Sequence, residues 1–501
     1  MKKNTIIFIL ILFSVCSIIA EGYQIIDAEY NISGRTREYA LNKSLDIQKN
    51  KVFSTKQDLE QYIAKLSQTL TNQRVLETSA ITYTEGEPNT EGIIPVTLYI
   101  DAKDTWNILP IPYPKYNSNT GLELKIKVKD FNFFGTMEPL DFEISYFQED
   151  EGTKHNLGIG FDFTIPFPIW KFDAEWDLSA EVDYTIGENK PDFSVSTGFS
   201  LAFPLSFATF NLIASQSVTL DSEYEDAGDD LFFNEYVELN VPLTILQTNS
   251  IANNLVFTPY VSFNFNWDKD KIQHEDLLSP ILSFGASFSL GNVDWIENFR
   301  KGISFNLTQD FAYNFGLNTN RFAPCISSTL EAFYATEYVA FNSRVFAFTY
   351  FGMDELTKNE IGGRIRGVSD LNKYNSSQVD TSSAIVVNMD IPVKVIKTDW
   401  RGWGKNIFKK DMPNWFGVLD FELQLSPFVD LALINNTATN TLFNPKDGLY
   451  GGGIEVIVYP LKMRSIQVRG SVGIDLGQFL LDADWRDGPK SEIEIGIGLH
   501  Y

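Results

Sequence analysis

Few side chains in this 501-residue chain have the types and spacing that catalysis or metal binding needs. The three histidines, His155, His274 and His500, lie far apart in the sequence. The sequence contains no nucleophile elbow, phosphate-binding loop or HExxH zinc motif. Once the N-terminal leader described below is removed, Cys325 is the only cysteine, so no disulfide can form within the chain. The sequence therefore predicts a protein that is not an enzyme and uses no cofactor or catalytic metal.

Acidic residues dominate the charge of the chain, which has 65 Asp and Glu against 40 Lys and Arg and a net charge of −25. This charge argues against nucleic-acid binding, which needs basic surfaces. The acidic run from Asp221 to Asp230 offers the oxygen ligands that calcium prefers, but it lacks the glycine-centred spacing of an EF-hand. A solvated surface loop is the preferred interpretation of this run.

From Trp106 onward, the chain is dominated by two-residue alternation of apolar and polar side chains. Between Lys171 and Tyr184, every odd position is polar or charged and every even position is apolar. Successive side chains of a strand point to opposite faces, so one face of this strand suits lipid and the other water. An aromatic content of 14% fits girdles at two membrane interfaces. The pattern predicts a mostly β protein with a transmembrane antiparallel barrel at 105–501; a soluble sandwich, the alternative, usually has shorter strands and aliphatic faces.

The end of the sequence has the same pattern. In the last nine residues, small or polar residues alternate with Ile493, Ile495, Ile497, Leu499 and Tyr501. A tilted strand of about nine to eleven residues spans a bilayer, and a terminal aromatic ring suits the lipid boundary. We expect this segment to be the closing strand of an outer-membrane barrel, although an ordinary half-buried strand would show the same alternation.

The N-terminus has the features of an exported protein. Lys2 and Lys3 precede an apolar segment from Ile6 to Ile19, and Ala20 offers a small residue before a cleavage point. Residues 1–20 are therefore predicted to be a signal peptide. Beyond them no apolar run approaches the ~18 residues of a helical span, so membrane integration requires a barrel.

Residues 22–104 have the pattern of a small soluble α+β module. Ser54 and Gln57 have the spacing of a capping box, and apolar residues then recur at helical intervals from Leu59 to Leu70. The predicted order is strand, helix, helix, strand, strand. This order, with a final strand leading into Trp106, resembles a POTRA domain, a periplasmic module that precedes certain outer-membrane barrels. Any other small α+β unit is the alternative.

The lengths of the predicted turns alternate along the barrel segment. Short turns are expected at 132–135, 166–168, 204–206 and 461–462, and long polar ones at 221–230 and 268–276. In outer-membrane barrels the short turns are periplasmic and the long loops external. Counting by pattern gives about eighteen strands, and an even number places both ends of the barrel on the periplasmic side.

The longest predicted external loop contains Gly362-Gly363-Arg364-Ile365-Arg366-Gly367-Val368. Five strands are expected to follow, one of them containing Pro427-Phe428-Val429-Asp430-Leu431-Ala432. The next begins with the glycine run 451–453. These motifs, in this order, resemble the BamA/TamA superfamily of outer-membrane assembly and translocation barrels, also called bacterial surface antigens.

The resemblance implies a role for the loop. In that superfamily a long loop folds into the lumen with a Val/Ile-Arg-Gly-aromatic tip. Ile365, Arg366 and Gly367 fit this motif, whereas Val368 replaces the aromatic residue and leaves a stacking role there in doubt. We expect Arg366 to pair with Asp430 on the lumen face of its strand, where Phe428 would cover the guanidinium.

The resemblance also implies about sixteen strands, so the pattern count would include one hairpin too many. It places a seam between the first strand, near Trp106, and the last. The seam residues are then Ile493, Gly496, Gly498 and Tyr501. Both glycines should weaken the closing strand, because glycine packs no side chain and costs backbone entropy.

The function implied is that of an insertase or translocase in the outer membrane of a diderm bacterium, with its soluble domain in the periplasm. The partners would be unfolded outer-membrane or secreted proteins, membrane lipid, and periplasmic or lipoprotein accessory factors. A passive cation-selective porin and a surface-exposed structural antigen are the alternatives.

One predicted periplasmic turn, Lys397 to Trp415, combines aromatic rings with cations. These residue types suit an anionic membrane surface. A plain solvated connector is the alternative.

Overall fold

The computed structural model describes residues 22–49, 51–117, 121–149, 154–205, 208–246, 254–351, 361, 364–368, 381–436, 439–463, 466–481 and 490–497. The predicted signal peptide, Gly498 and Tyr501 lie outside these residues. Contacts divide the chain into two units, Met1–Thr105 and Trp106–Tyr501. The boundary lies one residue from the one expected.

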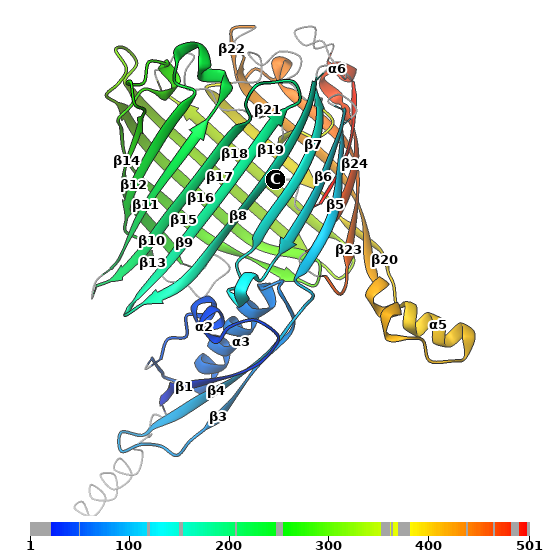
Figure 1. The fold of residues 1–501 in the computed structure, drawn as a ribbon. Coiled ribbons are helices and arrows are strands. Elements are labelled where there is room, and N and C mark those ends of the chain that lie inside the picture. Colours follow the sequence, from blue (N-terminus) through cyan, green and yellow to red (C-terminus); the bar gives the residue numbers. More distant parts are fainter. Residues whose placement is uncertain are drawn as a thin grey trace, which may run out of the picture. The chain divides into compact units, whose positions relative to one another are not determined.

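The first unit contains a four-stranded sheet and two helices (Figure 1). Its elements are β1 (Gly22–Ser33), α2 (Glu38–Leu45), β2 (Val52–Phe53), α3 (Lys56–Asn72), β3 (Leu76–Glu85) and β4 (Ile93–Asp104). The strand order is β2-β1-β4-β3, with β1 and β4 parallel. Apart from the short β2, the elements follow the predicted order.

The main helix of this unit, α3, has a different cap from the one expected. The side chain of Thr55 accepts a hydrogen bond from the Asp58 backbone N at 3.1 Å. The Thr55 hydroxyl also donates to Asp58 Oδ2 at 2.8 Å. The cap is therefore Thr55 with Asp58 at the third helical position, one residue later than the expected Ser54 with Gln57. The helix buries Leu59, Ile63, Leu66 and Leu70.

The second unit is a large antiparallel sheet whose strands follow one another in barrel order (Figure 1). Its first half is β5 (Ile108–Asn117), β6 (Gly121–Asp130), β7 (Leu140–Glu149), β8 (Lys154–Ile169), β9 (Phe172–Thr185), β10 (Asp192–Pro204), β11 (Thr209–Leu220), β12 (Leu231–Asn240), β13 (Leu243–Leu246), β14 (Leu255–Trp267) and β15 (Ile281–Ile296). Its second half is β16 (Phe299–Asn314), β17 (Phe322–Ala335), β18 (Ala340–Tyr350), β19 (Ser383–Asp390), β20 (Val393–Lys397), β21 (Phe421–Asn436), β22 (Thr441–Leu442), β23 (Leu449–Pro460), β24 (Val468–Asp475) and β25 (Ser491–Ile497).

Within the described residues the sheet makes eighteen passes, as the pattern count predicted. β13 and β20 continue β12 and β19 after a break, since each pair of segments faces one neighbouring strand. β22 is a two-residue arm at the end of β21. The resemblance implied about sixteen strands. That number is one hairpin lower than the number of strand passes in the structure. Two-residue alternation marks strands such as β9 and β21, which is why counting by pattern succeeded.

The turns alternate between the two ends of the sheet largely as expected. The turn at 132–135, the end of β10 at Pro204 and the end of β23 at Pro460 lie where the chain enters β5, and the 221–230 and 268–280 loops lie at the other end. One expected turn is wrong: Pro166–Pro168 belongs to β8, and the turn follows at Trp170. Trp170 adopts φ +56°, so a non-glycine residue makes the tight turn that the prolines were expected to make.

The described residues of the two end strands of this sheet pair at two positions. These are Glu494↔Asn117 and Ile495↔Tyr116. In contrast, β15 and β16 pair along their whole length, from Ile281↔Asn314 to Ile296↔Phe299. No helix in the part of the chain that the structure describes is both long enough and apolar enough to span a membrane.

Candidate functional site

The inward face of β21 is the foundation of the candidate site. Phe428 and Asp430 are buried on this face, whereas Val429 between them is 45% exposed on the other. Opposite exposure at successive positions follows from the pleat of the strand. The structure therefore places the predicted Phe428 and Asp430 side by side on the inner surface of the sheet.

A five-residue segment, 364–368, forms the loop tip that contacts this face. Gly367 has φ +82°, a left-handed conformation that L side chains rarely adopt. A Cβ atom at Gly451 would lie 1.8 Å from the Arg366 carbonyl oxygen, and one at Gly473 would lie 2.5 Å from the Gly367 Cα. Glycines on β23 and β24 thus leave the space that the loop tip fills.

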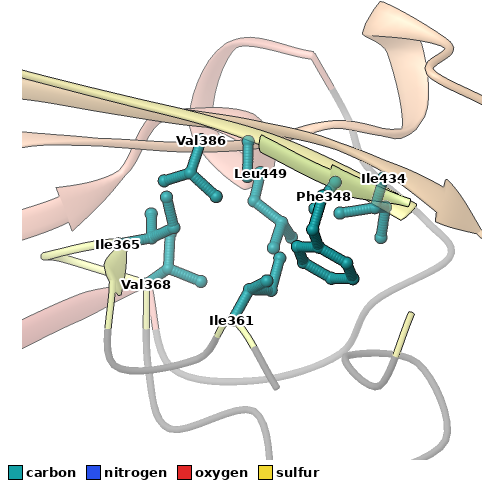
Figure 2. Packing of buried hydrophobic residues seen from close by; sticks show 9 residues of the cluster. Phe348, Ile361, Ile365, Val368, Val386, Ile434 and Leu449 are labelled. Carbon is teal, nitrogen blue, oxygen red and sulfur yellow. The ribbon is translucent and has the colours of Figure 1, made fainter. Parts of the chain in front are cut away.

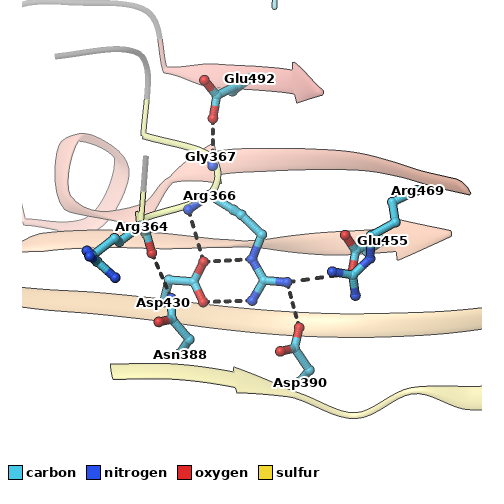
Figure 3. Close-up of polar contacts among 9 residues, drawn as sticks. All are labelled: Arg364, Arg366, Gly367, Asn388, Asp390, Asp430, Glu455, Arg469 and Glu492. Atoms are coloured by element: carbon cyan, nitrogen blue, oxygen red, sulfur yellow. Dashed lines mark hydrogen bonds and ion pairs between the residues drawn. The ribbon is translucent and has the colours of Figure 1, made fainter. Parts of the chain in front are cut away.

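Carboxylates from three strands surround the Arg366 guanidinium (Figure 3). Its Nε and Nη2 donate to Asp430 Oδ2 and Oδ1 at 2.8 and 2.7 Å, which is a bidentate pair. The Arg366 backbone N also donates to Asp430 Oδ2, at 2.9 Å. Nη1 donates to Asp390 Oδ1 of β19 at 2.6 Å and lies 3.7 Å from Glu455 Oε2 of β23.

The ion cluster is shielded from water. The side chains of Arg366, Asp390, Asp430 and Glu455 are at most 5% exposed. The Phe428 ring covers the guanidinium, with its centroid 4.0 Å from Arg366 Cζ. Buried charges are tolerated when they are paired, and removing one partner leaves the others without compensation at a cost of about 3–5 kcal/mol.

Apolar side chains on either side of Arg366 anchor the same segment. Ile365 and Val368 are buried with Phe348, Val386 and Ile434 in one cluster (Figure 2). Val368 therefore packs against the wall as an aliphatic residue at the position where the superfamily motif has an aromatic ring.

The loop tip also contacts the last strand. The Gly367 backbone N donates to Glu492 Oε2 of β25 at 3.1 Å (Figure 3). On the opposite side, Asn388 Nδ2 of β19 donates to the Arg364 carbonyl oxygen at 2.7 Å. One short segment thus links β19, β21, β23 and β25 from the inside.

Sequence reasoning missed three acidic residues of this site, Asp390, Glu455 and Glu492. Each lies at an inward position of an alternating strand, so the pattern contained the signal for the face. The pattern contained no signal for the height along the barrel, because that depends on the register between strands. Only register brings these carboxylates level with the loop tip.

The predicted seam residues are not part of this cluster. Ile493 is exposed on the outer face of β25, opposite in direction to the adjacent Glu492. Gly496 pairs with Arg469 of β24. Gly498 and Tyr501 lie outside the described residues, so their expected role stays a prediction.

Comparisons with known proteins were made by family, sequence and structure. No family model matches the chain. No curated protein matches it in sequence. Similar solved structures include CdiB from Acinetobacter baumannii, with 14% identity and a TM-score of 0.49 over 95% of this chain and 73% of that chain.

Two further similar structures cover most of the chain. BamA from Haemophilus ducreyi lacking POTRA domains 1–3 has 12% identity and a TM-score of 0.41, over 95% of this chain and 85% of that one. CdiB from Escherichia coli has 7% identity and a TM-score of 0.39, over 97% and 92%.

Proposed function

We propose that this chain is an outer-membrane protein that inserts protein substrates into the outer membrane or passes them across it. The observation that carries the proposal is the loop tip, whose Arg366 is bound by Asp430 and whose Gly367 is bound by Glu492. The tip thereby connects the inner wall to β25, an end strand whose described residues share two pairs with β5. A substrate strand can pair with such an end strand by β-augmentation.

The first unit offers a second edge for the same chemistry. Among the described residues β3 pairs with β4 alone, so the other side of this ten-residue strand is an edge of the described sheet. An extended segment of an unfolded substrate can add to such an edge through main-chain hydrogen bonds. In this proposal the unit is a POTRA-like periplasmic domain that captures the substrate, and the sheet of the second unit is the transmembrane barrel. Accessory periplasmic proteins or lipoproteins would deliver the substrate.

Depletion tests this proposal directly. When the protein is depleted, a set of other outer-membrane proteins should fall in abundance, as counted by quantitative mass spectrometry of purified outer membranes. The wild-type chain and a Gly160→Ala control should restore the set, and Arg366→Ala should not. An unchanged outer-membrane protein set after depletion would contradict the proposal.

A cation channel is the second candidate, and one observation favours it. The inward carboxylates of β9, among them Asp173, Glu175 and Glu181, are partly or fully exposed, so water reaches them. Rings of carboxylates favour cations in pores. If the loop fills the lumen, protein in a planar bilayer should show small, fluctuating conductance. Large, steady, cation-selective openings would support the channel instead.

The proposed orientation has its own test. Protease added to intact cells should cleave within 221–230 or 268–276 and leave residues 22–104 protected, because the long loops face outward. Cleavage of the first unit from outside would reverse the topology.

A further inference from the structure

A helical arm, defined as residues 398–420, connects β20 to β21 and contains α5 (Trp400–Phe408) and η6 (Asn414–Leu419). The arm folds back on itself: Trp400 Nε1 donates to the Leu419 carbonyl oxygen at 3.1 Å. Asp399 caps α5 by accepting from the Gly402 N at 2.9 Å. Figure 1 shows α5 beyond the end of β20, clear of the strands. The arm is thus an ordered projection from the end of the sheet at which β5 begins.

The arm exposes large apolar side chains that its own fold does not cover. Ile407 is 72% exposed and Phe408 68%, and Trp400, Trp403, Trp415 and Leu419 are also exposed. Trp400, Trp403 and Ile407 recur at helical spacing and therefore share one face of α5. Tryptophan is enriched at membrane interfaces, where one end of the ring meets lipid and the other meets water.

The charge of the arm is opposite to that of the chain. Residues 398–420 contain four basic and three acidic side chains, whereas the whole chain has 40 basic and 65 acidic. The three acidic groups have partners within the arm: Asp399 and Asp420 accept from backbone N–H groups and Asp411 pairs with Lys405 at 2.8 Å. Lys409 and Lys410 are exposed and have no ion-pair partner among the described residues. This arrangement complements an anionic surface.

The position of the arm completes the argument. Val395 of β20 and Leu425 of β21, on the strands that enter and leave the arm, are exposed apolar residues. The apolar outer surface of the sheet therefore continues onto the arm, and the cations begin where that surface ends. Basic amphipathic helices with aromatic residues bind in the plane of anionic bilayers in this way.

We propose that the arm lies on the membrane surface beside the sheet, with the Trp400, Trp403 and Ile407 face in the lipid and Lys409 and Lys410 on anionic phospholipid headgroups. This inference rests on the membrane position proposed above for the second unit. The contact would hold the end of the sheet where β20 leads into β21 at a fixed depth in the bilayer. β21 is the strand that carries Asp430.

Site-directed spin labels on the full chain in nanodiscs test the inference. In a chain with both cysteines replaced by serine, labels are placed at Ile407→Cys and, as the matched control one residue away, at Asn406→Cys. The Ile407 label should be reached by oxygen and shielded from a polar nickel reagent, and the Asn406 label should show the reverse. Adding phosphatidylglycerol to phosphatidylcholine discs should widen this difference several-fold, and Lys409→Glu with Lys410→Glu should abolish that gain.

A third label, at Val429→Cys on the outer face of β21, separates two kinds of failure. If Val429 reports lipid while positions 406 and 407 are equally open to nickel, the arm is free for a protein partner and the inference is overturned. If Val429 is open to nickel as well, the membrane position of the sheet is wrong and the proposed function fails first. A nickel-shielded Ile407 that ignores phosphatidylglycerol would overturn the assignment of anionic headgroups.

Discussion

Two walls of the same sheet carry the same alternation but differ in what covers their inner faces. On the covered wall, defined as β19, β21 and β23, the inward residues of β21 from Glu422 to Asn436 are all buried. On the open wall, defined as β8, β9 and β10, the inward carboxylates of β9 remain partly or fully exposed. Alternation therefore predicts the face on which a side chain lies. Whether that face is exposed to water depends on a loop from elsewhere in the chain.

The difference also explains which residue types each wall tolerates. On the open wall, water reaches the inward carboxylates of β9. Buried charges on the covered wall lie beside cations: the carboxylates around Arg366, and Glu422 of β21, whose Oε2 lies 3.5 Å from Lys394 Nζ. It needs glycine where the loop backbone touches it, as at Gly451.

The largest effect is expected from breaking the ion cluster of the covered wall. Arg366→Ala leaves Asp390, Asp430 and Glu455 buried without their shared cation, and Asp430→Ala removes only one of them. Each should cost about 3–5 kcal/mol of loop docking, with the arginine variant worse. Protease sensitivity of the loop and urea unfolding in micelles measure the loss. A double mutant should be little worse than either single one; simple additivity would show that the two residues do not act together.

A smaller effect is expected from adding one methyl group to each wall. Gly451→Ala on the covered wall places a Cβ against the Arg366 carbonyl and should cost about 1–3 kcal/mol by overpacking. Gly160→Ala on the open wall meets nothing closer than 3.6 Å and should be nearly neutral. Proteolysis of the loop, measured in both variants, compares the two walls through the same glycine-to-alanine change. Equal sensitivity would mean that the loop tip does not occupy the covered wall.

The smallest effect is expected at the rim above the open wall, where Lys190 Nζ lies 2.6 Å from Asp230 Oδ2. This hydrogen bond lowers the pKa of Asp230 in the folded chain. The pair therefore stabilises fully above the unfolded-state pKa of the carboxyl, and the stabilisation is lost as the pH falls through the lower folded-state pKa. An exposed pair contributes less than about 1 kcal/mol. Protease should cleave the wild type within 221–230 faster at acidic pH than at neutral pH. In the Asp230→Asn variant the two cleavage rates should be equal.

Local patterns predicted more of the fold than of the site. The strand passes, the two helices of the first unit and the alternation of turns follow from periodicity and length, which a single sequence displays. The Arg366–Asp430 contact was expected from two motifs. Asp390, Glu455 and Glu492 were not, because their place beside the loop depends on inter-strand register, which neighbouring residues do not encode.

The acidic run 221–230 illustrates the same limit. The sequence favoured a solvated loop, yet Asp229 is buried and its Oδ2 accepts from the backbone N of Gln273 and His274. Two loops that are distant in sequence contact each other at this carboxylate. Nothing in the composition of either loop distinguishes a docked aspartate from a solvated one.

The pairing of β25 with β5 constrains the order in which the chain can fold. Residues 117 and 494 can pair only after the chain between them has been synthesised. Bringing two distant segments together carries an entropy cost that grows with their separation in sequence. The Gly367 contact with Glu492 gives β25 a second attachment, from inside, to strands already in place. The loop tip would then act during biogenesis as a template that holds the last-made strand until the circle of strands is complete.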